Sequence, residues 1–342
     1  MGSIEELVRR VEDADRAELS AKALREHVLD ALRRVLPFEA HVFTLVDPST
    51  LVATSPHADV PMLPWERLPE TIRWRYLTLV NRVDTLAGHP AASLLSATEN
   101  PSDSLIWERV LREVGVRDTA MVTFADRYGV WGYLELWRTT GPFLGAELEV
   151  LTAISGALTA ALRSALARTF SEPDPASGRL GPAVVLLNND LVVQRQTEAA
   201  GVALLRLLPP DEPMAPIPAA AYNAAAALIA VEERVPLGEP WSRVHLGGNR
   251  WVTVRASRLG PDIAVSIEPS TPAERMELFA RAHGLSDRES EVVALLAIGL
   301  DTRELAGQLF LSEHTVNDHV KAVLAKTGAR TRPVLLARIN GG

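Results

Sequence analysis

Residues 285–339 read LSDRESEVVALLAIGLDTRELAGQLFLSEHTVNDHVKAVLAKTGARTRPVLLARI, and this stretch decides how the end of the chain folds. Ser286 and Glu289 have the spacing of a capping box, in which each side chain binds the other residue's free backbone amide. The apolar run that follows predicts a helix. Gly299 predicts its end, because glycine readily adopts the left-handed conformation that closes helices.

Three more helices follow from the same signals. Asp301 with Glu304 predicts the start of a short second helix. Ser312 is a suitable cap for a third helix, which Gly328 ends. Thr331 can cap a fourth helix, so the tail is expected to be all-α with four helices.

The third helix has two different faces when its residues are placed ~100° apart on a helical wheel. One arc holds apolar positions: Val316, Val320, Val323, Leu324 and Thr327. The opposite arc holds His314, Asn317, Asp318, Lys321 and Ala325. A helix that buries one stripe and presents short polar and cationic side chains outward fits a DNA major groove, so we predict a recognition helix.

The order of caps and core positions over residues 285–337 resembles the LuxR/FixJ-type helix-turn-helix family. The resemblance implies a DNA-binding transcription regulator with its two-helix unit at residues 301–320. It also implies that Thr315 contacts phosphate, while Asn317, Asp318 and Lys321 face bases. The full set of expected DNA-binding residues is Ser312, Thr315, Asn317, Asp318, Lys321, Lys326 and Arg332, the last two as phosphate contacts.

Asn317 departs from the pattern of the family, in which many members carry Lys or Arg at this position. Asn pairs bidentately with adenine and Lys with guanine, while Asp accepts from cytosine; each good pair contributes ~1–3 kcal/mol of discrimination. Asp318 also repels phosphate, and a single acid on a polar face is usually only solvated. We therefore predict that the tail discriminates between base sequences and does not bind DNA tightly without regard to sequence.

Composition limits the remaining possibilities. The 342 residues include no cysteine, which excludes disulfides, thiolate zinc sites and cysteine nucleophiles. The net charge is −8, but residues 281–342 carry eight Lys and Arg against seven Asp and Glu, so the excess acid lies upstream. The N-terminus has no apolar signal core and no apolar run approaches ~20 residues, so a cytoplasmic protein is expected.

Two stretches rich in Pro, Gly and Ser predict domain boundaries: residues 171–182 and EPSTPAER from Glu268. The expected organisation is an α+β multidomain chain with two sensor domains before the helical tail. The predicted limits are 1–170 for the first domain, 171–182 for a linker, 183–270 for the second domain and 278–342 for the DNA-binding domain.

The first domain begins with two helical patterns and a strand, AHVFTLVD. Residues 118–138 predict two strands around a turn at 126–129, and residues 144–169 predict a long helix. A hairpin followed by a closing helix resembles a GAF domain and implies a sensor. The motif of the cyclic-nucleotide-binding members is missing, so that ligand class gains no support.

The second domain begins with strand, turn, strand and helix, and the Ala-rich segment around Tyr222 predicts a further helix. Three strands then follow in WSRVHLG, RWVTVRASRL and DIAVSIEP, separated by turn residues. This pattern resembles a PAS domain and predicts an antiparallel meander packed against the Ala-rich helix.

Histidines and aromatic residues of the first domain are weaker site candidates. His27, His41, His57 and His89 lack the spacing of metal ligands, so ordinary histidines are the favoured interpretation. Six aromatic residues could line a small-molecule pocket, although core packing is favoured. They are Trp65, Trp74, Tyr76, Trp107, Trp131 and Trp137.

The leading hypothesis is a regulator whose sensor domains bind a ligand or partner and modulate the DNA-binding tail. The alternative is a ligand-independent dimer in which both sensor folds are only scaffold. The sequence has no Walker A, GxGxxG, GxSxG or HExxH motif, so no enzyme and no cofactor are expected. The expected partners are double-stranded DNA, an effector and a second copy, paired through the helix at 144–169 or at 332–339.

Overall fold

The computed structural model describes residues 4–173, 181–207 and 219–341, and its backbone contacts form two compact units. The first unit consists of Met1–Ala165, Gly178–Val244 and Val252–Glu268, and the second of Leu166–Ser177, His245–Trp251 and Pro269–Gly342. Both sheets therefore belong to one unit. The limits of three separate domains stay a prediction.

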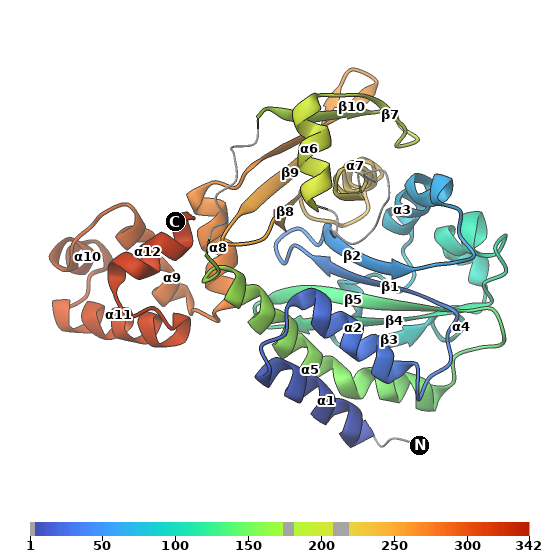
Figure 1. Ribbon diagram of the computed structural model, residues 1–342, viewed down its shortest axis with the longest axis horizontal. Coiled ribbons are helices and arrows are strands. Elements are labelled where there is room, and N and C mark those ends of the chain that lie inside the picture. Colours follow the sequence, from blue (N-terminus) through green and yellow to red (C-terminus); the bar gives the residue numbers. More distant parts are fainter. Residues whose placement is uncertain (1–3, 174–180, 208–218, 342) are drawn as a thin grey trace. The chain divides into compact units, whose positions relative to one another are not determined.

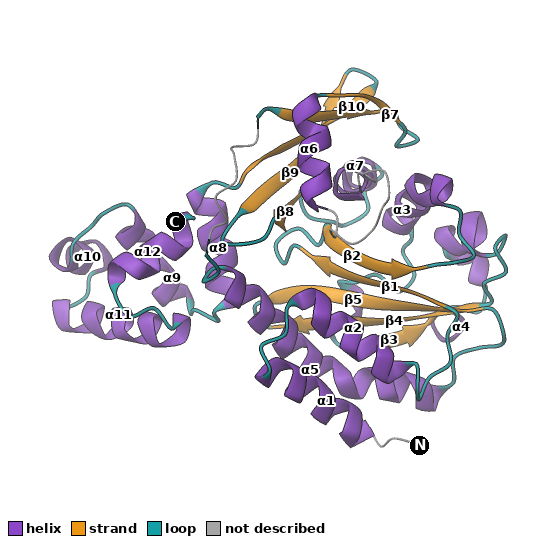
Figure 2. Ribbon diagram, viewed as in Figure 1, coloured by secondary structure: helices purple, strands orange, loops and turns teal. Residues whose placement is uncertain are grey.

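The architecture is α+β, as expected, with two five-stranded sheets followed by a helical tail (Figures 1 and 2). The strands are β1 (Ala40–Val46), β2 (Ala53–Asp59), β3 (Ala91–Ser93), β4 (Asp118–Asp126), β5 (Gly129–Arg138), β6 (Ala183–Leu187), β7 (Val193–Gln196), β8 (Trp241–His245), β9 (Trp251–Leu259) and β10 (Asp262–Pro269). The helices are α1 (Ile4–Arg16), α2 (Ala21–Leu32), α3 (Leu68–Leu77), α4 (Leu94–Ala97), α5 (Gly145–Thr169), α6 (Glu198–Leu207), α7 (Ala219–Glu232), α8 (Pro272–Ala282), α9 (Asp287–Ala297), α10 (Thr302–Leu309), α11 (Glu313–Thr327) and α12 (Arg332–Asn340). Single helical turns occupy Trp65–Arg67, Thr85–Ala87, Pro101–Asp103 and Trp107–Leu111.

The first sheet has the strand order β2-β1-β5-β4-β3, and the predicted hairpin is its β4–β5 pair. Gly132 of β5 lies opposite Leu45 of the paired strand β1, where an added side chain would meet the carbonyl oxygen of Thr44 at 2.6 Å. Figure 1 shows α1, α2 and α5 on one side of this sheet and α3 and α7 on the other. Alternate residues of β5 therefore face different helices.

The second sheet has the order β7-β6-β10-β9-β8, which repeats the order of the first sheet when its strands are counted from β6. All three strands predicted after Tyr222 are present in it. The Ala-rich helix α7 is almost wholly buried and contacts α3 and β2, a contact that the sequence did not predict. Its short side chains permit this close approach of backbones.

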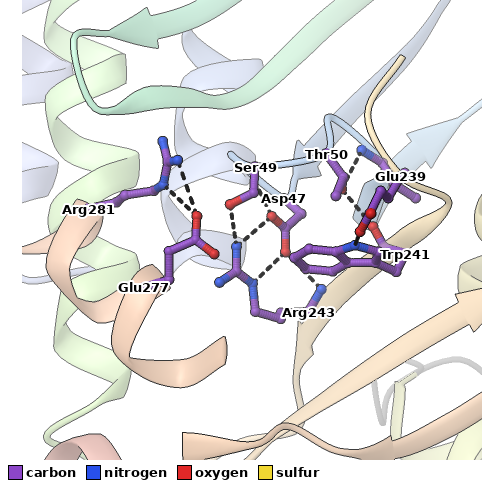
Figure 3. A network of polar contacts seen from close by, with 9 residues as sticks. Asp47, Ser49, Thr50, Glu239, Trp241, Arg243, Glu277 and Arg281 are labelled. Atoms are coloured by element: carbon purple, nitrogen blue, oxygen red, sulfur yellow. Dashed lines mark hydrogen bonds and ion pairs between the residues drawn. The ribbon is translucent and has the colours of Figure 1, made fainter. Parts of the chain in front are cut away.

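A buried ion pair joins the end of β1 to β8 (Figure 3). Asp47 Oδ2 accepts hydrogen bonds from the backbone N (2.9 Å) and Nε (2.7 Å) of Arg243, and Oδ1 accepts from Nη2 at 2.7 Å. Ser49 Oγ accepts a further bond from the same guanidinium at 2.7 Å. Both charged side chains are completely buried, so the pair locks the first sheet to the second.

The second unit has its own aromatic core. Phe170 stacks on Trp251 with ring centroids 5.4 Å apart and contacts the edge of Phe279 at 5.2 Å. Arg275 is buried beside these rings and donates to the carbonyl oxygen of Ile339 at 2.6 Å. Residues of α8, α9, α11 and α12 complete the same apolar cluster, so the helical tail is packed as one body.

The boundary predicted at Glu268 coincides with the division of the two units between Glu268 and Pro269, but the stretch there is secondary structure and not a linker. Strand β10 continues to Pro269, and Thr271 caps α8 through a capping box with Glu274. Proline is compatible with the first position of a helix. The stretch resembled a linker because Pro and Ser also mark loops. Helix α8 therefore begins before residue 278, the predicted start of the DNA-binding domain.

Helix α5 is the one helix of the described residues that is long and apolar enough to cross a membrane. Within its most apolar 18-residue window, 44% is buried inside the protein. A core helix that packs under a sheet passes the same test of length and composition, so this is weak evidence for a membrane span.

Arg243→Met is expected to destabilise the first unit by ~3–5 kcal/mol, because Asp47 would keep a buried and unpaired charge. The double variant Asp47→Leu with Arg243→Met should recover much of this loss, since it removes both charges. Urea denaturation followed by tryptophan fluorescence measures both free energies of unfolding.

The matched control is Arg258→Met, which breaks the partly exposed pair between Arg258 and Glu232. A loss of at most ~1 kcal/mol is expected there. Equal losses for the two arginine variants would contradict the role given to the buried pair.

Candidate nucleic-acid interface

Helices α10 and α11 form the predicted helix-turn-helix. Asp301 Oδ1 accepts from the amides of Arg303 and Glu304 at 2.8 Å, which fixes the start of α10. Phe310 ends α10 in the left-handed conformation, with φ of 54°. Ser312 Oγ then accepts from the Thr315 amide at 3.1 Å and starts α11, so all predicted caps of this unit are confirmed.

The inward face of α11 is the predicted one. Val316, Val320, Val323 and Thr327 are buried, and Leu324 is partly buried. Val316 and Val320 share an apolar cluster with α9 and α10, including Leu305 of α10. This packing sets the rotation of α11 about its axis and leaves the opposite arc outward.

The outward face of α11 carries its charges as a small local network. Asp318 lies between Lys321, whose Nζ is 3.3 Å from a carboxylate oxygen, and His314, whose Nε2 is 3.4 Å from the other. All three side chains are exposed. Lys321 therefore offsets the negative charge of Asp318, and both groups are accessible to a ligand in solvent.

Asn317 is more constrained than the sequence indicated. Arg332 Nη2 donates to Asn317 Oδ1 at 3.0 Å, and Nη1 donates to Thr302 Oγ1 at 3.0 Å. One guanidinium thus joins the starts of α10 and α12 to the middle of α11. Bidentate adenine pairing needs both the oxygen and the amide nitrogen of Asn, and because an amide oxygen can accept two hydrogen bonds, adenine would share Oδ1 with Arg332.

The first turn of α11 combines a side-chain cap with exposed residues. Ser312 Oγ and Thr315 Oγ1 lie 2.9 Å apart, so one hydroxyl donates to the other. A helix N-terminus carries partial positive charge and attracts phosphate. Both residues lie at this N-terminus, and their DNA contacts stay a prediction.

Lys326 has a structural partner that the sequence did not reveal. Its Nζ donates to Glu289 Oε2 at 2.6 Å and to the Gly284 carbonyl at 3.3 Å. Burial opposes ionisation of Glu289, but this ammonium and hydrogen bonds from Ser286 outweigh burial and hold the Glu289 pKa below its usual range. A phosphate contact by Lys326 would compete with this pair.

Two exposed arginines of the tail were not among the phosphate candidates named from sequence. Arg303 and Arg330 are exposed, and among the described residues neither forms an ion pair. Neither lies on α11, and sequence reasoning that started from the recognition helix passed them over. Arg303 lies on α10 and Arg330 in the turn before α12.

The candidates of the first domain divide into core residues and cavity residues. Trp131 Nε1 donates to Asp126 at 3.0 Å and Trp107 Nε1 to the Val116 carbonyl at 3.0 Å, as expected for packed side chains. Trp65 and Trp137 instead border a cavity. Among the described residues, no three His, Cys, Asp or Glu side chains gather as metal ligands would.

Comparison with known proteins finds a family match and related sequences for the helical tail. Residues 283–338 match the family model described as bacterial regulatory proteins, luxR family. The transcriptional regulatory protein DesR of Bacillus subtilis is 34% identical over 62 residues, which is 18% of this chain and 31% of DesR. The spore germination protein GerE of the same organism is 42% identical over 48 residues, or 14% of this chain and 65% of GerE.

Two further similarities involve other organisms. The DNA-binding transcriptional activator DevR/DosR of Mycobacterium tuberculosis is 41% identical over 49 residues, which is 14% of this chain and 23% of that protein. These relatives are thus matched over less than two thirds of their own lengths. A crystal structure of Escherichia coli SdiA aligns over 99% of this chain and 98% of its own, with a TM-score of 0.39 and 13% identity.

Lys326→Met is expected to destabilise the tail by ~1–2 kcal/mol at pH 7, because Glu289 would keep a nearly buried charge without its partner. The pKa of Glu289 is lowered by folding, so its stabilising contribution is present above the unfolded pKa. It is lost as the pH falls through the folded pKa.

The difference between wild type and Lys326→Met should therefore shrink between pH 7 and pH 3. Hydrogen exchange of the α9 and α11 amides measures it in the full chain. Lys22→Met, on the surface of α2, is the matched control and should leave these amides unchanged. A difference that does not depend on pH would exclude the assigned pairing.

Proposed function

We propose that this chain, whose residues 283–338 match the luxR family model, is a sequence-specific transcription regulator that binds DNA through these residues. The observation that carries the proposal is α11, which buries one face in the tail and turns Asn317, Asp318 and Lys321 outward. A helix of this kind enters the major groove, where each base pair presents a distinct pattern of donors and acceptors.

The roles of the individual residues follow from their surroundings. Lys321 is the outward cation of α11 and is proposed to donate to guanine. Asp318 is proposed to accept from cytosine, with Lys321 beside it to reduce repulsion of phosphate. Ser312 and Thr315 are proposed to contact phosphate at the start of α11.

Arg332 is proposed to act in two ways. In the protein without DNA it fixes Asn317 and the start of α10. Its charge also lies near the helix-turn-helix, where it can contribute to phosphate binding. Lys326 is proposed to act on the fold first, because Glu289 already holds its ammonium group.

The first unit is proposed to sense a ligand or partner and to modulate DNA binding. Two five-stranded sheets with the same strand order support this assignment. They are proposed to be GAF-like and PAS-like folds, and the regulator is proposed to function in the cytoplasm without catalysing a reaction. We further propose a homodimer, because paired half-sites multiply affinity. The competing proposal is a ligand-independent dimeric DNA-binding protein with both sheets as scaffold.

Selection of random duplex DNA by the full-length protein at controlled salt tests the function. Enrichment of a palindrome is the expected result, and failure to enrich any sequence would contradict sequence-specific binding. Repeating the selection with a pool of small metabolites separates the two proposals. A palindrome whose recovery changes with metabolites supports sensing, and one that is unaffected supports the scaffold alternative.

Lys321→Ala is expected to weaken binding to the selected operator ~5–150-fold, because one base contact corresponds to ~1–3 kcal/mol, and to relax choice at one base pair. Arg330, exposed in the turn before α12, is proposed to contact phosphate, so Arg330→Ala should weaken all sequences alike and reduce the salt slope by about 1. Fluorescence anisotropy with operator and scrambled DNA measures both. Lys22→Ala is the control, and identical behaviour of Lys321→Ala and Arg330→Ala would exclude the groove-facing assignment.

A further inference from the structure

One guanidinium group holds the side-chain amide of Asn317 in a single orientation. Arg332 Nη2 donates to Asn317 Oδ1 at 3.0 Å, and Arg332 Nη1 donates to Thr302 Oγ1 at 3.0 Å. Arg332 begins α12, Thr302 begins α10, and Asn317 lies on α11. The guanidinium therefore connects three helices of the tail, and the contact with Thr302 keeps it beside Asn317.

The chemistry of this contact decides which end of the amide faces Arg332. A guanidinium has donors and no acceptor, so it can bind only the amide oxygen, and the amide nitrogen points elsewhere. That nitrogen makes no hydrogen bond to the described residues, and it is not one of their buried atoms that lack a partner, so solvent reaches it. Asn317 therefore presents a free donor from the outward arc of α11.

The charge of Arg332 acts on this amide without compensation. In the described part of the chain, no carboxylate lies within ion-pair distance of its guanidinium, and both of its side-chain partners are neutral. Lys321, by contrast, is paired with Asp318. A hydrogen bond to the oxygen of an amide polarises the group and strengthens its N–H as a donor. The positive charge also repels any second donor that approaches the same oxygen.

These two effects favour one purine over the other. Guanine presents two acceptors in the major groove, N7 and O6, and the polarised amide nitrogen of Asn317 can donate to them. Adenine presents the acceptor N7 beside its N6 amino group, a donor that would have to approach the oxygen that Arg332 already binds. Without Arg332, the same asparagine would be free to pair bidentately with adenine.

We propose that Arg332 is a positioning residue that makes Asn317 select guanine in place of adenine. The inference rests on the proposed function, in which α11 enters the major groove. It deepens that function by naming the base that Asn317 selects and the residue that decides the selection. Arg332 acts here through the amide of Asn317 and without a base contact of its own.

The first test uses the full-length protein and the operator that it selects from random duplex DNA. The selection is repeated with Asn317→Ala, and the base pair at which this variant loses choice is the one that Asn317 contacts. We expect a G·C pair there in the wild type. Fluorescence anisotropy should show at least about fivefold tighter binding of this operator than of a copy with A·T at that pair, the lower end for one good base contact.

Two variants and one control separate the roles of the two residues. Arg332→Met removes the donors, so the ratio of affinities for the G·C and A·T operators should fall at least about fivefold. Asn317→Asp keeps an oxygen for Arg332 but has no amide donor, so the guanine preference should be lost. Arg330→Ala is the matched control, because it removes an exposed tail arginine that, within the described residues, forms no hydrogen bond with Asn317. It should weaken both operators alike and leave their ratio unchanged.

The proposal is overturned if the wild type does not select G·C at that pair, or if Asn317→Ala loses choice at no pair. It is also overturned if Arg332→Met weakens both operators alike and lowers the salt slope, the result expected of a phosphate contact alone. If Arg332→Met does not fold, the wild type and Asn317→Asp decide the matter, and a guanine preference retained in Asn317→Asp overturns the proposal.

The same selection separates this inference from the function on which it rests. If the wild type enriches no sequence, sequence-specific binding fails and the inference fails with it. If it enriches an operator that carries A·T at the pair contacted by Asn317, only the role given to Arg332 is overturned.

Discussion

The first unit depends on a single buried ion pair, Asp47 with Arg243, formed by residues 196 positions apart. Two completely buried charges are tolerated only when each is fully hydrogen-bonded, and the carboxylate here receives three bonds from one residue. Such a pair adds little net stability over apolar side chains, but it penalises every arrangement in which either charge is left alone. It therefore specifies which strand ends meet, and with them how the two sheets lie against each other.

That arrangement also encloses the cavity that Trp65 and Trp137 border. With the sheets joined, α7 can contact α3 and β2, and Asn223 reaches the same space as Glu135 of the first sheet. The alternation of β5 supplies one wall and the turn spacing of α3 another. Neither segment alone encloses a volume, so the cavity belongs to the packed unit and not to either predicted domain.

In the helical tail, apolar packing determines how α11 is oriented, and polar contacts determine which of its exposed side chains are accessible. The buried valines set the rotation of α11, and the pair of Lys326 with Glu289 ties its far end to α9. Arg332 holds Asn317 from the side. The base contacts proposed above are left to a short outward row in which the charges of Lys321 and Asp318 compensate each other. Such a row attracts phosphate less strongly than a row of cations does.

The sequence by itself determined part of the elements of this protein, among them the helices of the tail and the β4–β5 hairpin, but it assigned nothing to β2, α3, β3 or α4. Capping boxes such as Asp301 with Glu304 act over three residues, and alternation along β5 acts over two, so local spacing was enough to predict them. It also placed the outward arc of α11 and the family resemblance of the tail. Only the tertiary structure decided which side chains meet across long separations: Arg243 with Asp47, Lys326 with Glu289, and α7 with the cavity. An arginine or lysine on a polar face has the same local pattern whether it faces solvent or a distant carboxylate. Whether such a side chain pairs with a carboxylate depends on how its helix or strand packs against another element that is distant in the sequence.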